Sequence, residues 1–370
     1  MGLEKERVYR AAILSITGIG SQRLRQLIAS FGSAEHAWEA ETDLFAGFEN
    51  TPWIKEFFQH RKRIDPITIE LSLRKNGISL VMLGEENYPF LLAECPDAPP
   101  LLYYKGNLEP KKEGLAIVGS RHATPYGKAA ASYLARSIAE TDYVVISGLA
   151  RGIDSAAHKG ALEADGITWA FLAGGLDVIY PPENVGLAQT IMQKGALISE
   201  YPPGVPPEAG LFPARNRLIS GSSRGVIVVE AAERSGSMIT VDFALEQGRE
   251  VFAVPGPIFS KQSRGTHQLL KMGAKLVSDK EDVFSELLFA PQWNKTGEFA
   301  GEISNDKRET KQPGKKNEIL EILTDVPLHI DRLTAQCSLS PQEIALSLLE
   351  LQLSGEIVQL PGQNYVLQRK

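Results

Sequence analysis

Short apolar runs alternate with longer segments of helical period between residues 114 and 288. The runs predicted as strands are Leu115–Val118, Val144–Ser147, Thr168–Ala173, Leu197–Ser199, Gly225–Val229, Val251–Val254 and Lys275–Val277. The helical segments cover about 126–140, 154–164, 185–194, 238–248, 265–272 and 280–288. Nearly continuous apolar strands that alternate with helices are typical of a parallel sheet covered on both faces. We therefore predict an α/β fold with a Rossmann-like, doubly wound, mostly parallel sheet, in a domain spanning 76–290.

The N-terminal segment shows helical spacing on both sides of a glycine turn. Leu24, Leu27 and Phe31 recur along one helix face, and Gly18-Ile19-Gly20 separates this helix from the apolar one before it. We predict a helical domain over residues 1–75 of the helix-hairpin-helix or SAM-like type. In such a turn the free N–H groups that begin the second helix can face a phosphate. An ordinary helical turn that ends on glycine is the alternative interpretation.

The C-terminal part divides into a polar segment and a small predicted domain. Residues 291–316 lose periodicity and become polar, so we interpret them as a linker. Three helix-like segments follow from residue 317, and EIVQLPGQNYVL then predicts a hairpin with Pro361-Gly362 at its tip. Helices followed by a hairpin indicate a winged-helix domain over 317–370.

Composition narrows the setting in which the protein works. The 370 residues are enough for two or three domains, and a content of 43% hydrophobic and 23% charged residues is ordinary for a globular protein. Cys95 and Cys337 have no partners at metal-ligand spacing, so we expect no metal site and no disulfide framework. We see no apolar N-terminal run, and no apolar stretch approaches the ~20 residues that span a bilayer. We expect a cytoplasmic protein without a membrane partner.

The net charge of −6 argues against indiscriminate nucleic-acid binding, so any such site must be a confined basic surface. In open parallel sheets, ligands bind beyond the carboxyl ends of the strands. Arg121 follows the first predicted strand and Arg151 the second, each beside glycines that let backbone approach a ligand. A planar guanidinium suits phosphate. The alternative is a solvated arginine in an ordinary strand-to-helix turn.

The segment Phe212–Arg217 is interpreted as an exposed loop rich in proline and glycine. Arg215 and Arg217 can follow phosphates, and an aromatic ring can stack on a base, which contributes ~1–3 kcal/mol per base. An ordinary core position is the alternative for Phe212. Further along, Arg234–Ser237 and Arg264–Thr266 precede helices and offer N–H groups and hydroxyls to a phosphate.

Several arginine- and glycine-bearing loops thus converge on one rim, which suits an extended polyanion better than one small cofactor. The predicted DNA-binding residues are Gly119, Ser120, Arg121, Gly148, Arg151, Gly152, Phe212, Arg215, Asn216, Arg217, Arg234, Ser235, Gly236, Ser237, Gly265 and Thr266. We expect Asp154 to cap the helix that follows it, and His158 to be packed or hydrogen-bonded. No catalytic residue and no cofactor are predicted.

The ordered motifs GSR, SGLARGID, LAGGLDVIYPPEN, FPARNRLISG, ERSGSMIT, ALEQGREVFAVPG and SRGTHQLLKMGA resemble those of the DNA-processing protein A (DprA/Smf) family. The resemblance is dense over about 114–280 and implies a Rossmann-fold homodimer. It implies that the protein binds single-stranded DNA and helps to load the RecA recombinase in natural transformation. It also implies that Arg121 and the Arg215–Arg217 segment hold the strand, with Phe212 near a base. His267 stands where the family turn has asparagine, which leaves a hydrogen bond of that turn open.

Two enzyme classes share a Rossmann-like domain and are weighed against this interpretation. A dehydrogenase is disfavoured because no G-x-G-x-x-G follows the first predicted strand, and a P-loop is likewise missing from the sequence. A nucleotide phosphoribohydrolase would carry P-G-G-x-G-T-x-x-E where this chain has SGSMITVDFALEQG. Glu246 lies too far along the predicted helix to be the catalytic acid. The phosphoribohydrolase remains the alternative to a non-enzymatic DNA-binding protein.

Overall fold

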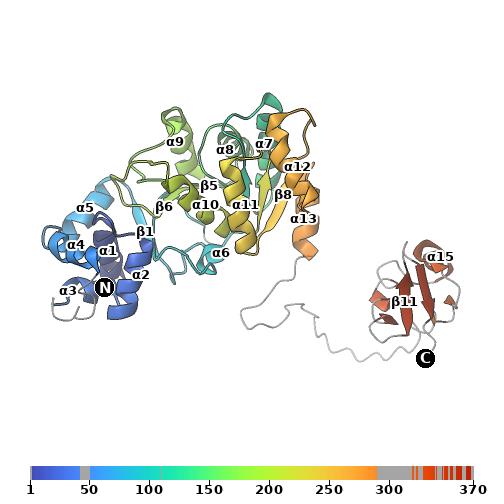
Figure 1. Ribbon diagram of the computed structural model, residues 1–370, viewed down its shortest axis with the longest axis horizontal. Coiled ribbons are helices and arrows are strands. Elements are labelled where there is room, and N and C mark those ends of the chain that lie inside the picture. The colour runs from blue at the N-terminus through green and yellow to red at the C-terminus, as the bar shows by residue number, and fades with distance from the viewer. Residues whose placement is uncertain are drawn as a thin grey trace. The chain divides into compact units, whose positions relative to one another are not determined.

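The computed structural model describes residues 2–41, 51–109 and 111–289, together with parts of 319–367. The chain divides into two compact units, Met1–Ala290 and Pro291–Lys370 (Figure 1). The predicted linker 291–316 lies outside the described residues. In the part of the chain that is described, no helix combines the length and the apolar character that crossing a bilayer requires.

A nine-stranded sheet forms the centre of the first unit. Its strands are β1 (Ser79–Met82), β2 (Leu101–Gly106), β3 (Gly114–Val118), β4 (Val144–Ser147), β5 (Thr168–Phe171), β6 (Ala196–Ser199), β7 (Gly225–Val228), β8 (Glu250–Ala253) and β9 (Lys275–Leu276). They lie in the order β1-β2-β6-β5-β4-β3-β7-β8-β9. All pairings from β6 to β9 are parallel. The strand order reverses between β3 and β7, so the predicted doubly wound, mostly parallel sheet is confirmed.

Two strands at one edge of the sheet are missing from the prediction. The segment 76–108 contains β1, the short helix α6 (Phe90–Ala93) and β2. β1 pairs with β2, and β2 with β6, both antiparallel. The runs are short and stand among prolines, so their strand signal is weak in the sequence.

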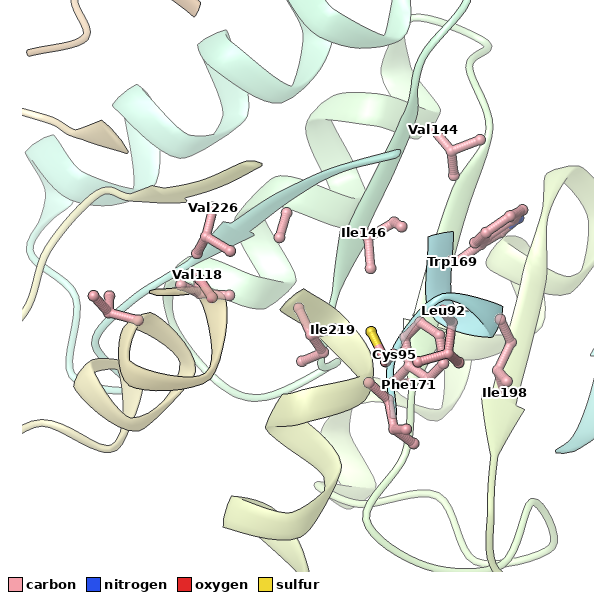
Figure 2. Packing of buried hydrophobic residues seen from close by; sticks show 14 of the residues in the cluster. Leu92, Cys95, Val118, Val144, Ile146, Trp169, Phe171, Ile198, Ile219 and Val226 are labelled. Carbon is pink, nitrogen blue, oxygen red and sulfur yellow. The ribbon is translucent and has the colours of Figure 1, made fainter. Parts of the chain in front are cut away.

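Helices cover both faces of the sheet. They are α7 (Pro125–Ala139), α8 (Ile153–Glu163), α9 (Val185–Lys194), α10 (Leu211–Gly221), α11 (Gly236–Glu246), α12 (Arg264–Lys271) and α13 (Lys280–Phe289). Side chains alternate along β3: Ala116 and Val118 pack in the cluster that includes α10, α11 and α12. Leu115 and Ile117 pack with α7, α8 and α13. Figure 2 shows the first cluster, where Val118, Phe171 and Ile219 are labelled. Each fully buried large apolar side chain contributes about 1.5–3 kcal/mol.

Helix α10 overturns one expectation, since the sequence predicts an exposed loop over Phe212–Arg217. The structure has a helix from Leu211 to Gly221. Pro213 lies in its first turn, where the missing N–H has no intrahelical partner to lose, so proline is tolerated there. Leu218 and Ile219 are buried and anchor the helix on the sheet. The density of prolines and glycines around 202–213 hid this helix in the sequence.

The N-terminal residues form α1 (Gly2–Leu14), α2 (Ser21–Phe31), α3 (Ala34–Glu39), α4 (Pro52–Arg61) and α5 (Pro66–Lys75). Helix α1 contacts each of the other four, and it also contacts β1 and β2. The predicted helix pair around the glycine turn is confirmed. At the start of the second helix, Ser21 Oγ donates to Glu200 Oε2 at 3.2 Å. Glu200 is buried beyond β6, and its carboxylate would repel a phosphate there.

Arg217 ties three segments of the first unit together. Its Nη2 donates to Glu200 Oε2 at 2.5 Å, and its Nη1 donates to the carbonyl of Asp97 at 2.8 Å. The Arg217 side chain is 13% exposed and that of Glu200 is 6% exposed. This clasp, formed by Arg217, Glu200 and Asp97, therefore joins α10, the end of β6 and the segment after α6.

The buried His158 side chain links the turn between β4 and α8 to β5 through hydrogen bonds. Thr168 Oγ1 donates to the carbonyl of Val145 at 2.7 Å, so His158 Nδ1 donates to Thr168 Oγ1, which lies 2.7 Å away. His158 Nε2 then accepts from the N–H of Leu149 at 3.3 Å. Leu149 has a positive φ of 56°. Burial lowers the pKa of His158 to about 3. The neutral imidazole is thus a structural prop, as the sequence predicts.

In the second unit, the described residues include β10 (Leu328–His329), α15 (Ile330–Gln336), β11 (Ile357–Leu360) and β12 (Asn364–Leu367). The strands form an antiparallel sheet in the order β10-β12-β11. The predicted hairpin is confirmed, with Ile357 opposite Leu367 and Leu360 opposite Asn364. Its Pro361-Gly362 tip lies outside the described residues. Apolar side chains from 319 to 365 form one buried cluster in this unit.

The clasp predicts that Arg217→Ala destabilises the first unit by about 2–4 kcal/mol, because the substitution leaves the Glu200 carboxylate buried without its cation. Urea unfolding followed by circular dichroism measures the change. Arg74→Ala is the matched control. The Arg74 side chain is 66% exposed and forms ion pairs with Glu4 and Glu70, so we expect the free energy of unfolding to fall by less than about 1 kcal/mol. Equal losses in the two variants would refute a structural clasp.

The buried His158 predicts a pH dependence of unfolding. Between pH 6.5 and about 3 the unfolded chain binds a proton at His158 that the folded chain does not, so stability falls as the pH falls. At pH 4.5 this loss amounts to about 3 kcal/mol. In His158→Gln, whose side-chain carbonyl can still accept from Leu149, this part of the dependence is expected to vanish. Urea unfolding of both proteins at pH 7.5 and 4.5 tests it, and parallel losses would count against the assignment.

Candidate nucleic-acid interface

A pocket of about 680 Å³ lies beyond the carboxyl ends of the parallel strands. Its walls come from the segments that follow β3, β4, β5, β6, β7 and β8. This is the place where an open doubly wound sheet binds its ligands. The predicted site residues that line it are Gly119, Ser120, Arg121, Phe212, Arg215, Asn216, Ser235, Gly236 and Ser237. A volume of about 680 Å³ lies within the range of small-molecule and cofactor sites.

Arg121 and Phe212 form the exposed chemical surface of the pocket. The guanidinium carbon of Arg121 lies 4.7 Å from the centroid of the Phe212 ring, within the range of a cation–π contact. The Arg121 side chain is exposed, and Phe212 is half-buried on the pocket wall, outside the hydrophobic core. Phe212 therefore does not occupy the core position that was its alternative interpretation. An exposed cation thus lies over a flat, half-buried ring at the pocket wall.

The row of aromatic rings and guanidinium groups continues along the rim. The ring of Tyr180 meets that of Phe212 edge-on at 5.8 Å, and the guanidinium of Arg151 lies 5.8 Å from the Tyr180 ring. Arg151 is outside the pocket lining and is held by Glu183 through both carboxylate oxygens. The predicted residue set lacks Tyr180, although the aromatic after the third predicted strand was a signal that could have found it.

Arg215 is a buried wall residue. Its Nη1 donates to the carbonyl of Gly148 at 2.6 Å and to the carbonyl of Phe171, which fastens α10 to the ends of β4 and β5. Burial lowers the pKa of Arg215 to about 10, so it stays charged at neutral pH. A Cβ at Gly148 would overlap this guanidinium. The glycine is therefore needed to admit Arg215, and the guanidinium is engaged by the backbone.

Asp154 organises the turn before α8 and does not cap the helix as predicted. Its Oδ2 accepts from the N–H groups of Gly148 at 3.2 Å and Ala150 at 3.3 Å. The N-cap of α8 is Gly152, which makes no side-chain cap, because Asp154 is already inside the first turn and reaches back over the loop. Burial raises the pKa of Asp154. Gly152 has φ 76°, and a Cβ there would overlap the Ser120 carbonyl, so glycine allows this close approach.

The start of α11 opens into the pocket. Ser235 is its N-cap and accepts from the N–H of Ser237 at 3.3 Å, while the two hydroxyl oxygens lie 2.8 Å apart. Asn216 Nδ2 donates to the carbonyl of Gly236 at 3.2 Å and so fixes this helix end to α10. Unsatisfied N–H groups and hydroxyls at a helix start are suited to an anion. The start of α7 differs, because the Glu230 carboxylate accepts from Thr124 N at 2.8 Å.

Several predicted site residues lie away from the pocket. Arg217 belongs to the clasp and is absent from the pocket lining, so the structure does not bring it together with Arg121. Arg234 is exposed beyond the lining. Gly265 and Thr266 are buried, with Gly265 N donating to the Ala231 carbonyl at 2.8 Å. His267 Nε2 donates to the Gly256 carbonyl at 2.9 Å, so this turn keeps a hydrogen bond.

The chemistry around the pocket offers little to a phosphoribohydrolase. Asp154 is the one carboxylate among the described lining residues, and backbone N–H groups engage it. Glu246 ends α11, at the opposite end from the pocket. Among the residues that the structure describes, no group of three or more His, Cys, Asp or Glu side chains could hold a metal ion.

Comparison with known proteins relates most of the chain to one protein family. Residues 79–288 match the family model of DNA recombination-mediator protein A, and residues 307–363 match that of the DprA winged helix domain. Protein Smf of Escherichia coli is 41% identical over 293 residues, covering 79% of this chain and 78% of the relative. The predicted winged-helix domain is thereby supported by a second, independent line.

Two solved structures resemble the fold. DprA of Streptococcus pneumoniae superposes with a TM-score of 0.67 at 38% identity, over 75% of this chain and 97% of the other. DNA processing protein A of Helicobacter pylori, described for its single-stranded DNA binding mode, gives a TM-score of 0.52 at 34% identity, over 57% and 95%. The chain belongs to the DNA recombination-mediator protein A family, also called DprA or Smf, because the motifs and the doubly wound sheet of this chain agree with these matches.

Proposed function

We propose that this protein binds single-stranded DNA in the pocket beyond the sheet, without catalysing a reaction. One observation carries the proposal: the exposed Arg121 guanidinium stacks on the Phe212 ring at the pocket wall. A cation beside a flat ring suits a phosphate and its neighbouring base, which single-stranded binding sites combine. The H. pylori relative, described for its single-stranded DNA binding mode, supports the same ligand.

Binding here is positional and independent of sequence. Arg121 and the start of α11 take phosphates, because Arg121 is exposed and because Ser235, Gly236 and Ser237 line the pocket at a helix N-terminus. Phe212 and Tyr180 stack bases, since every base has a flat face. The fixed charge of Arg215 behind the wall adds a positive field on a chain of net charge −6. Because the chain is acidic overall, any DNA site must be a confined basic surface, and Arg121 and Arg215 provide its positive charge.

The biological role that we propose is the protection of incoming single-stranded DNA and the loading of RecA in natural transformation, by a cytoplasmic homodimer. Family membership supports the role in recombination. A boundary between helical and Rossmann-like domains near residue 75 is part of the same proposal.

An exposed apolar edge supports the dimer: β9 is the last strand of the sheet, Leu276 on it is 51% exposed and the neighbouring Met272 is 69% exposed. Sedimentation of a monomer at micromolar concentration would remove the dimer.

Arg121→Ala is expected to weaken binding to oligo-dT about tenfold and equally across sequences, because it removes one phosphate contact. With three to five phosphates neutralised, log K falls with log salt at a slope of about −2 to −3.5, and the variant lowers its magnitude by about 0.7. Fluorescence anisotropy over a salt series measures both. Arg136→Ala, an exposed arginine in the last turn of α7, is the matched control. Unchanged affinity in Arg121→Ala would contradict the proposal, and release of free base from a nucleotide would favour the phosphoribohydrolase.

Glu183 competes with phosphate for Arg151, since it holds that guanidinium in the free protein. Glu183→Gln removes the competing charge, so we expect affinity for single-stranded DNA to rise several-fold and the salt slope to steepen by about 0.7. The double variant Arg151→Ala/Glu183→Gln loses the gain. The same anisotropy titration applies, and a gain that persists in the double variant would show that Arg151 does not meet the strand.

A further inference from the structure

The segment between β8 and α12 presents an apolar tip to solvent. Phe259 is 94% exposed and Ile258 is 75% exposed. Among the described residues, no other large apolar side chain is as exposed as Phe259. A bare aromatic ring in water loses the free energy that burial would supply, so such a ring marks a contact surface.

The backbone under this ring is fixed. The Tyr126 hydroxyl donates to the Pro255 carbonyl at 2.9 Å, and His267 Nε2 donates to the Gly256 carbonyl at 2.9 Å. On the other side, Ser260 caps the short helix Lys261–Ser263, and the Gln262 carbonyl accepts from Ala231 N at 2.7 Å. A ring on an anchored segment loses little further freedom when a partner binds.

Exposed cationic side chains lie on the same segment as the ring and on the segment beside it. Lys261 and Arg264 are exposed on the same segment, and Arg234 is exposed on the neighbouring segment after β7. In the ion pairs found among the described residues, none of the three takes part. Across residues 231–237 and 255–264, Glu233 is the one acidic residue. An exposed ring among cations without ion pairs is complementary to a base and its flanking phosphates.

The segment is continuous with the pocket. Gln262 lines the pocket wall and lies between Lys261 and Arg264 in sequence. Resting on the proposed function, we infer that the single strand leaves the pocket past Gln262 and stacks a further base on Phe259, with phosphates on Lys261, Arg264 and Arg234. This second subsite, which we call the β8–α12 platform (Pro255–Arg264 with Arg234), would lengthen the contact between the strand and the protein beyond the pocket.

A second copy of the chain is the rival occupant of this tip. A two-fold contact through Phe259 would bring Lys261 and Arg264 of one copy close to the same cations of the other, and nearby like charges repel. Charge therefore favours a polyanion on the platform.

The test compares oligo-dT of about six nucleotides, which fills the pocket, with oligo-dT of about twenty, which also reaches the platform. In the full-length protein, Phe259→Ala is expected to weaken the long oligonucleotide about 5- to 50-fold and to leave the short one unchanged. Arg121→Ala weakens both, so a failed platform and a failed pocket are distinguishable. Leu71→Ala, an exposed leucine on α5, is the matched apolar control and changes neither.

A second variant reads the contact directly. Phe259→Trp is expected to keep the long-oligonucleotide affinity and to show fluorescence quenching on binding it, with no quenching by the short one. Equal affinities of Phe259→Ala and the wild type for the long oligonucleotide would overturn the platform. A loss of affinity that accompanies a change in sedimentation from dimer to monomer would also overturn it, since the ring would then serve a second copy.

Discussion

The buried guanidinium of Arg215 holds the pocket in shape. One of its nitrogens donates to two carbonyls that end neighbouring strands, those of Gly148 and Phe171, and its backbone belongs to α10. The helix that carries Phe212 and Asn216 is therefore fixed against the sheet at its carboxyl edge. Burying a cation is unfavourable unless its donors are satisfied, and here the two carbonyls accept from Nη1 while Asn216 Oδ1 accepts from Nε at 3.3 Å. The rest of the site is arranged around this contact.

Structural and binding arginines are separated by what they contact. Arg215 and Arg217 follow each other closely on α10, yet carbonyls hold the first and the carboxylate of Glu200 holds the second. Arg121 instead touches a ring and faces solvent, and Arg151 is held by an exposed carboxylate that a phosphate can displace. An acidic protein can thus present a small cationic surface, because only its exposed guanidinium groups are open to a polyanion.

The fold and the edge where the site lies could be predicted because both follow from periodicity. Apolar strands alternating with helices imply a doubly wound sheet, and loops after such strands meet at one edge. The role of each arginine could not be predicted, because exposure depends on tertiary packing. A guanidinium buried against Phe171, 44 residues away in the chain, leaves no local signal. Helix α10 was missed for a related reason: Pro213 suggests a loop, whereas burial of Leu218 and Ile219 favours a helix.

The roles of the glycines likewise could not be predicted from the sequence, because they depend on tertiary packing. Gly148 and Gly152 were expected to let a ligand approach the backbone, and they serve instead to admit Arg215 and the Ser120 carbonyl. The Arg121–Phe212 pair remains the centre of the account, and a crystal structure of the protein with oligo-dT tests it most directly. We expect a phosphate oxygen within hydrogen-bond distance of Arg121 and a base against Phe212. A strand bound on another face, with the pocket left to solvent, would contradict it.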